Sequence, residues 1–332
     1  MTGQLDYHSI WQGPLYEGVD ETTFHTEAPG ADLFCRCWRP AAEAVAAVQL
    51  VHGMAEHSGR YRHVASVLAS RGWVVYAHDH RGHGHTAVNR NRLGLLAEKG
   101  GWRHAVDDVH RINEHIGGEH PELPVALVGH SMGSFLAQHY AIEHGERLAA
   151  LVLSGSDNRS DLSALVGSFL AGTIARLRGP GHRSGLLRHM TTGAFRRQID
   201  DADSQAAWLS RDRAVVRAFE DDPLTGFEPS AAMWRDILRG VHFIGRTSNR
   251  SHVPPALPVL LMVGGADPLS DGGRRVRLLA EAYRKAGLRD VSVREYPLAR
   301  HEVFNEINRT EVLADLVDWL ASRLSSGEES GA

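Results

Sequence analysis

A serine inside a short glycine motif is the strongest candidate nucleophile in this chain. Residues 129–133 read Gly-His-Ser-Met-Gly, with Ser131 at the centre of a Gly-x-Ser-x-Gly pattern. The apolar run 124–128 precedes the motif, and apolar residues at helical spacing follow it over 135–142. A strand, a sharp turn and a helix in this order form an elbow that exposes a serine hydroxyl, and the two glycines leave room for the turn.

A serine hydroxyl needs a general base within hydrogen-bond reach, and that base needs a third group to fix its tautomer. In open parallel sheets such groups gather beyond the carboxyl ends of the strands. Asp267 follows the apolar run 259–263, and His301 follows the run 291–296. The order Ser131, Asp267, His301 is the one expected behind a nucleophile elbow. We therefore predict a Ser-His-Asp triad.

Alternatives stay open for the acid and the base. Asp157 follows the run 150–153 and meets the same positional criterion as Asp267. Asp267 also precedes Pro268, a context in which Asp commonly serves only as a turn residue. The chain has 21 histidines, so any one of them is by default a surface or packing residue. The position after the last predicted strand favours His301.

Attack on an acyl carbonyl also requires N–H donors for the negative charge that develops on its oxygen. One donor should be the backbone N–H of Met132, the residue after the nucleophile. The second should come from the loop after an early central strand, where residues 52–56 read His-Gly-Met-Ala-Glu. We predict the backbone N–H of Met54 as that donor.

Several segments together resemble the monoacylglycerol lipase and lysophospholipase group of α/β-hydrolases. The segments are 52–61, 79–84, 129–133, 208–212, 267–270 and 299–302. The resemblance runs from about residue 20 to 322 and is weakest over 157–193. It implies Ser131 as nucleophile, Asp267 as acid, His301 as base, and Met54 and Met132 as oxyanion donors.

The elements that must position these residues follow an alternating pattern. Short apolar runs alternate with helix-length amphipathic segments, which predicts an α/β-hydrolase fold: a mostly parallel central sheet with helices on both faces. The predicted strands are 45–51, 73–77, 125–128, 150–153, 259–263 and 291–296, and the predicted helices include 61–70, 102–116, 274–286 and 303–324. We expect a core over 1–156 and 256–324, an inserted helical cap over 157–255, and a disordered tail over 325–332.

Composition narrows the function. The chain has 332 residues, 42% of them hydrophobic, and a formal net charge of -4, so nucleic acid is not an expected partner. We expect a serine ester hydrolase that cleaves single-chain acyl esters of monoacylglycerol or lysophospholipid type through an acyl-enzyme, with no cofactor. A peptidase or acyltransferase on the same scaffold, or a non-catalytic binding protein, is the alternative.

The compartment follows from what the chain lacks. The first 20 residues contain no apolar signal region, and no run of eighteen apolar residues occurs, so the expected compartment is the cytoplasm. Cys35 and Cys37 share one face of a strand-like segment and should stay reduced. Apolar residues at helical spacing over 162–177 should pack onto the core, with transient membrane contact through the cap as the alternative. The oligomeric state is not predicted.

A histidine cluster and two acidic pairs could suggest metal binding, but we assign them structural roles. His78, His80, His83 and His85 suggest zinc, but the segment offers no clear fourth ligand, so we interpret it as a structural loop. The acidic pairs Asp200–Asp201 and Asp221–Asp222 should be solvated helix ends. We therefore predict no metal site.

Overall fold

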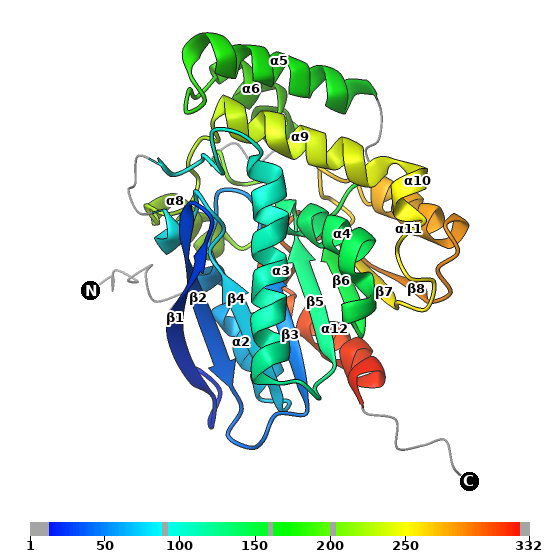
Figure 1. Cartoon of the computed structure of the whole chain (residues 1–332). Coiled ribbons are helices and arrows are strands. Elements are labelled where there is room, and N and C mark those ends of the chain that lie inside the picture. The colour runs from blue at the N-terminus through cyan, green and yellow to red at the C-terminus, as the bar shows by residue number, and fades with distance from the viewer. Residues whose placement is uncertain (1–12, 88–91, 159–161, 200–203, 326–332) are drawn as a thin grey trace.

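A computed structural model describes residues 13–87, 92–158, 162–199 and 204–325. Its centre is an eight-stranded sheet in the order β1-β2-β4-β3-β5-β6-β7-β8 (Figure 1). The parallel part consists of β4, β3, β5, β6, β7 and β8, and its strands coincide closely with the six predicted apolar runs. Their bounds are β3 Ala46–Val51, β4 Trp73–His78, β5 Val125–His130, β6 Ala150–Ser154, β7 Val259–Gly264 and β8 Val291–Tyr296.

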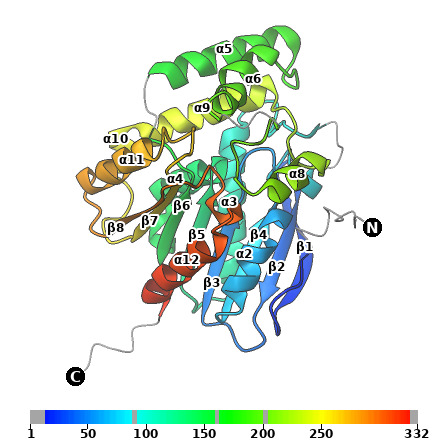
Figure 2. The ribbon, with the colours of Figure 1, turned by 180° about the vertical axis from the view of Figure 1, so that it is seen from behind.

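Helices cover both faces of the sheet, as Figures 1 and 2 show from opposite sides. One face packs against α3 (Gly101–Glu119), α4 (Met132–His144) and α11 (Arg274–Lys285). The other face packs against α2 (Arg62–Ala69) and α12 (Arg309–Leu324). The predicted α/β-hydrolase fold is confirmed. The last helix begins later than predicted, because residues 303–305 form a separate 3-10 turn.

An antiparallel hairpin that the apolar pattern did not reveal forms one edge of the sheet. It consists of β1 (Asp20–Ala28) and β2 (Ala31–Arg39), and β2 also pairs antiparallel with β4. None of the β1 residues is fully buried, so its sequence lacks the apolar signal of a core strand. Cys35 and Cys37 lie buried in β2 as free thiols, and burial raises the pKa of Cys35 to about 12.

The chain between β6 and β7 is helical and lies beyond the carboxyl ends of the parallel strands (Figure 1). Its helices are α5 Leu162–Arg178, α6 Gly185–Met190, α7 Thr192–Arg196, α8 Arg213–Asp221, α9 Ala231–Gly245 and α10 Thr247–Arg250. Helix α9 packs on α3 and α4, and α5 packs on α9. Helix α9 therefore joins α5 to the core helices.

The apolar face of α5 does not pack onto the core, so that expectation was wrong. Helix α5 buries its small residues, Ala164, Ser168, Ala171 and Ala175, which allow close approach to α9. Four of its large apolar residues, Leu165, Val166, Phe169 and Leu177, are exposed, and Phe169 and Leu177 are 78% and 76% exposed. Leu170 and Ile174 are partly buried. Periodicity identified an apolar helix, but the smaller side chains form its buried contact. No helix in the described part of the chain is both long and apolar enough to cross a bilayer.

A glycine in α9 allows the close packing of the inserted helices on the core. A Cβ at Gly240 would lie 2.0 Å from the ring of Trp102 in α3. We expect Gly240→Ala to lower the free energy of unfolding by about 1–3 kcal/mol, because the rigid indole must move. Urea denaturation measures this change.

Gly118→Ala in α3 is the matched control. A Cβ there meets nothing within 4 Å, so the replacement should leave the stability unchanged or raise it by up to about 1 kcal/mol. Equal effects of the two substitutions would contradict the role of Gly240 in packing.

Candidate active site

The sharp turn between β5 and α4 holds Ser131 in a strained conformation. Its backbone angles are φ 52° and ψ -120°, a region of backbone conformation that residues other than glycine rarely adopt. A Cβ at Gly133 would lie 2.1 Å from the carbonyl oxygen of Val51, and one at Gly129 would lie 2.5 Å from that of Gly133. The two glycines are therefore required for the elbow, as the motif predicted.

Ser131, His301 and Asp267 lie together although they are far apart in the sequence. The Nε2 atom of His301 is 2.9 Å from the Oγ atom of Ser131, and its Nδ1 atom is 3.1 Å from Oδ1 of Asp267. Both partners of the serine are buried. The alternative acid, Asp157, instead faces Arg275, at 3.8 Å. The three predicted residues thus have the relative positions that a triad requires.

The surroundings of His301 make its ring more basic. Burial alone lowers the pKa of His301, but the charge of Asp267 and its contact with the ring, together with the charges of Glu302 and Glu56, outweigh burial and raise that pKa above its ordinary value of 6.5. The ring of His130 lies nearby and is tilted by 51° to the ring of His301, with centroids 4.8 Å apart. Burial lowers the pKa of His130 to about 3, so this neighbouring ring remains neutral near pH 7.

Two backbone amides are placed as potential oxyanion donors. Met132 is the first residue of α4, where N–H groups have no acceptor within the helix. In the other loop, Gly53 N–H donates to Oε1 of Glu56, and the carbonyl of Gly53 accepts from Nδ1 of His52 at 2.7 Å. These bonds fix the peptides around Met54, whose own amide has no acceptor among the residues that the structure describes.

One histidine of the predicted structural loop, His80, forms hydrogen bonds with His52 in the loop that carries this second amide. His80 N–H donates to Nε2 of His52 at 2.9 Å, and Nε2 of His80 lies 3.1 Å from the carbonyl of His52. Burial lowers the pKa of both rings well below 6.5, so both rings remain neutral. Within the described ranges, no group of three or more His, Cys, Asp or Glu residues could hold a metal ion.

A buried ion network joins the Met54 loop to the His301 loop. Arg60 donates to Oε2 of Glu56 at 2.6 Å and to both carboxylate oxygens of Glu302 at 2.7 Å. Tyr61 O–H donates to Oε1 of Glu56, the same atom that accepts from Gly53. Glu302 directly follows His301, so this single guanidinium connects the two loops. The sequence resemblance included Arg60 and Glu302 but assigned no role to them.

The inserted segment also contacts both loops. Trp208 lies against His301, with ring centroids 4.9 Å apart, and Glu302 N–H donates to the carbonyl of Leu209 at 2.8 Å. His57 lies 2.9 Å from Asp222, which is only 9% exposed. The expectation of a solvated Asp222 was therefore wrong, because the carboxylate has a buried imidazole partner. Asp221 is exposed, whereas Asp200 and Asp201 lie outside the described residues.

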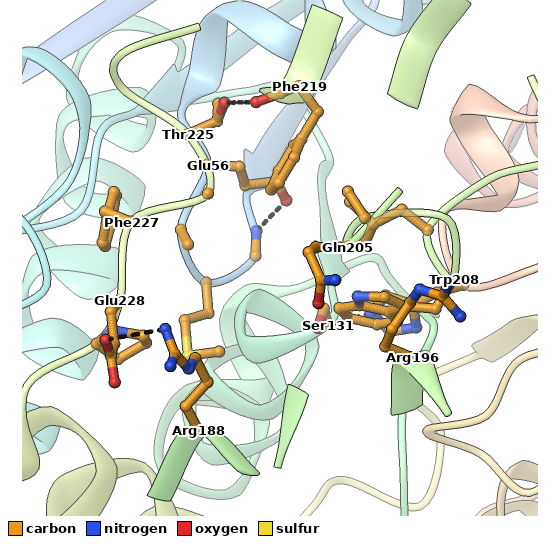
Figure 3. A pocket seen from close by; sticks show the side chains of 18 of the residues that line it. Glu56, Ser131, Arg188, Arg196, Gln205, Trp208, Phe219, Thr225, Phe227 and Glu228 are labelled. Atoms are coloured by element: carbon orange, nitrogen blue, oxygen red, sulfur yellow. Dashed lines mark hydrogen bonds and ion pairs between the residues drawn. The ribbon is translucent and has the colours of Figure 1, made fainter. Parts of the chain in front are cut away.

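A cavity of about 1000 Å³ opens over Ser131 (Figure 3). Apolar side chains from both the sheet loops and the insertion line it, among them Met54, Trp208, Phe219, Phe227, Trp234 and Leu269. Acidic and basic side chains also line it, namely Glu56, Arg188, His189, Arg196, Arg197, Glu220, Glu228 and Glu302. Sequence patterns indicated only the lining residues within 52–61, 129–133, 208–212, 267–270 and 299–302, and the others were missed because they converge from separate parts of the insertion.

Comparison with known proteins agrees with this geometry. A family described as "Serine aminopeptidase, S33" matches residues 42–308. A monoacylglycerol lipase of Mycolicibacterium smegmatis is 32% identical over 89% of this chain and 95% of its own. Human monoglyceride lipase is 30% identical over 85% of this chain and 87% of its own. A thermostable carboxyl esterase of Bacillus coagulans, solved with glycerol, superimposes with a TM-score of 0.85 over 92% of this chain and 99% of its own, at 26% identity.

The comparisons and the fold lead to one assignment. The family match spans most of the chain, and relatives at about a third identity cover nearly its full length. The chain therefore belongs to the serine aminopeptidase S33 family, as a monoacylglycerol lipase-like carboxylic ester hydrolase of the α/β-hydrolase fold.

Proposed function

We propose that this hydrolase cleaves single-chain acyl esters of monoacylglycerol or lysophospholipid type through an acyl-enzyme on Ser131. The observation that carries the proposal is the 2.9 Å contact between Ser131 Oγ and His301 Nε2 at the base of a large, partly apolar cavity. The names of the relatives, which are monoacylglycerol lipases, support the substrate class.

The proposed reaction uses each group in turn. His301 accepts the proton of Ser131 Oγ as this oxygen attacks the ester carbonyl, and Asp267 stabilises the imidazolium that forms. The amides of Met54 and Met132 donate to the oxyanion. His301 then protonates the leaving alcohol. Water, deprotonated by His301, attacks the acyl-enzyme and releases the fatty acid and Ser131.

We also propose that residues 157–255 act as a cap that selects the substrate, over a core of 1–156 and 256–324. The cavity lies between the sheet loops and this insertion, and most of its lining comes from the insertion. Apolar side chains such as Phe219, Phe227 and Trp234 would contact the acyl chain. The core would then supply the chemistry and the cap would supply the selectivity.

A peptidase is the second candidate, because the family carries that description. An aminopeptidase needs cap carboxylates that bind the substrate's ammonium group. Glu228 lies 3.7 Å from Arg188, and exposed Glu220 accepts a hydrogen bond from Ser204 at 2.7 Å. A cavity with abundant apolar lining and a paired Glu228 favours the ester substrate.

We further propose that the cap contacts a lipid surface. Six large apolar residues of α5 and α6 are exposed, namely Leu165, Val166, Phe169, Leu177, Leu186 and Met190. Gly185 and Arg188 of α6 line the cavity, so this helix carries both exposed apolar residues and part of the cavity wall. Exposed apolar residues next to basic ones are typical of helices that lie on membranes, and Arg176 and Arg178 end α5.

The role of Ser131 is tested by Ser131→Ala. We expect kcat/KM for a medium-chain monoacylglycerol to fall by at least about 10⁴-fold, because no other group can form the acyl-enzyme. A fluorophosphonate probe should label the wild type and fail to label this variant. Ser251→Ala, at an exposed helix end, is the control and should be labelled normally. Activity of Ser131→Ala within tenfold of the wild type would refute the mechanism.

The role of His301 predicts the pH dependence. The base must be neutral to accept a proton, and its pKa lies above 6.5 because of Asp267. Therefore kcat/KM for a water-soluble ester should rise with pH through a single transition above pH 6.5. Asp267→Asn removes the charge, so the transition should move to lower pH and the rate should fall by about 10⁴-fold. A flat wild-type profile from about pH 5 to 8 would exclude His301 as the base.

The lipid contact is tested by the double variant Phe169→Asp, Leu177→Asp. Each apolar side chain contributes on the order of 1.5–3 kcal/mol when buried, so binding to phospholipid vesicles should weaken at least tenfold in a cosedimentation assay. Val45→Asp is the control, since Val45 is also exposed but directly precedes β3, at the amino end of that strand and away from the cap. Circular dichroism checks that both variants fold. Equal vesicle binding by both would contradict the contact.

A further inference from the structure

Four basic residues of the cap line the cavity over Ser131. Arg188 and His189 belong to α6, Arg196 ends α7, and Arg197 follows it. The proposed acyl chain requires only the apolar lining, so these charges need a separate explanation. An uncharged glycerol ester would leave them without a ligand partner.

Contacts between aromatic rings place Arg196 close to the reacting groups. Phe195, its neighbour in α7, lies against Trp208 with ring centroids 5.3 Å apart. Trp208 in turn lies against His301, which contacts Ser131. Figure 3 shows Arg196 alongside Trp208, with both side chains in the cavity wall. A head group attached to an ester at Ser131 would therefore be near this guanidinium.

Most of the carboxylates that line the cavity already have a positively charged partner. Glu56 and Glu302 both pair with Arg60, and Glu228 pairs with Arg188. The fourth, Glu220, is exposed and accepts a hydrogen bond from Ser204.

Arg196 and Arg197 have no carboxylate partner within the described ranges. Arg196 donates to the carbonyl of Ile199 at 2.9 Å, and its buried Nε has no acceptor there. Arg197 contacts only His189, through the carbonyl at 3.2 Å and Nδ1 at 3.4 Å. Asp200, Asp201 and Asp203 follow in the sequence and lie outside the described residues. The experiment below therefore measures directly how the charges of Arg196 and Arg197 affect substrate preference.

We propose that the cavity selects acyl esters whose head group carries a phosphate or similar anion, bound by Arg196 and Arg197. The inference rests on the proposed function and narrows its substrate class to anionic head groups. Guanidinium groups bind phosphate through paired, charge-assisted hydrogen bonds. A single-chain glycerol ester with a terminal phosphate presents both the acyl chain and the anion.

The test compares two substrates that differ only in the phosphate: 1-octanoylglycerol and 1-octanoylglycerol 3-phosphate, both as monomers. For the wild type, kcat/KM should be at least tenfold higher for the phosphate ester. The double variant Arg196→Gln, Arg197→Gln should lower this ratio at least tenfold, mainly through KM. The conservative variant Arg196→Lys, Arg197→Lys should restore part of the ratio. Arg239→Gln, at an exposed residue of α9 outside the cavity lining, should keep the wild-type ratio.

Free glycerol 3-phosphate provides a second measurement that does not depend on turnover of the charged ester. It should inhibit hydrolysis of 1-octanoylglycerol by the wild type, and inhibit the double Gln variant at least tenfold more weakly. A wild-type ratio at or below one, or an unchanged ratio in the double Gln variant, would overturn the anion selectivity and leave the ester hydrolase intact. If the wild type hydrolysed neither ester, the proposed function itself would fail.

Discussion

The buried ion pairs of Arg60 hold the two halves of the candidate active site together. Glu56 lies in the loop that carries the Met54 amide, and Glu302 directly follows His301. Burial opposes ionisation of Glu302, but the guanidinium outweighs burial and holds the pKa of Glu302 at about 2. Removing one member of a buried pair leaves an uncompensated charge and typically costs 3–5 kcal/mol. The geometry around Ser131 therefore depends on groups that never touch the reacting atoms.

The same guanidinium also contacts the cap. Arg60 lies 4.8 Å from the ring centroid of Phe219 in α8, and Phe219 lines the cavity. His57, three residues earlier, pairs with Asp222 just after α8. The loop that contains the candidate oxyanion donor is thus connected to the sheet through His52 and His80, and to the cap through His57 and Arg60. A displacement of α8 would move groups that fix the Met54 amide.

The sequence predicted the parts of the site that lie next to regular elements. Ser131, Asp267 and His301 each follow an apolar strand, and parallel strands bring their carboxyl ends to one edge, so position along the chain indicated position in space. The edge strand β1 was missed because it buries no side chain fully. Asp222 looked solvated because its partner, His57, is 165 residues away in sequence. Periodicity identifies the apolar side of a helix but not its partner, which is why the exposed face of α5 was misassigned.

The arginines of the core and of the cavity wall differ in their burial and in their carboxylate partners. Arg60 is fully buried and pairs with two carboxylates, whereas Arg196 and Arg197 contact only backbone carbonyls and the His189 ring within the described ranges. A substitution at Arg60 disturbs both loops of the candidate catalytic machinery. A substitution at Arg196 or Arg197 alters the charge of the cavity without breaking a carboxylate pair there. Substrate preference can therefore change through the cap at little cost in stability, while the geometry of the core is retained.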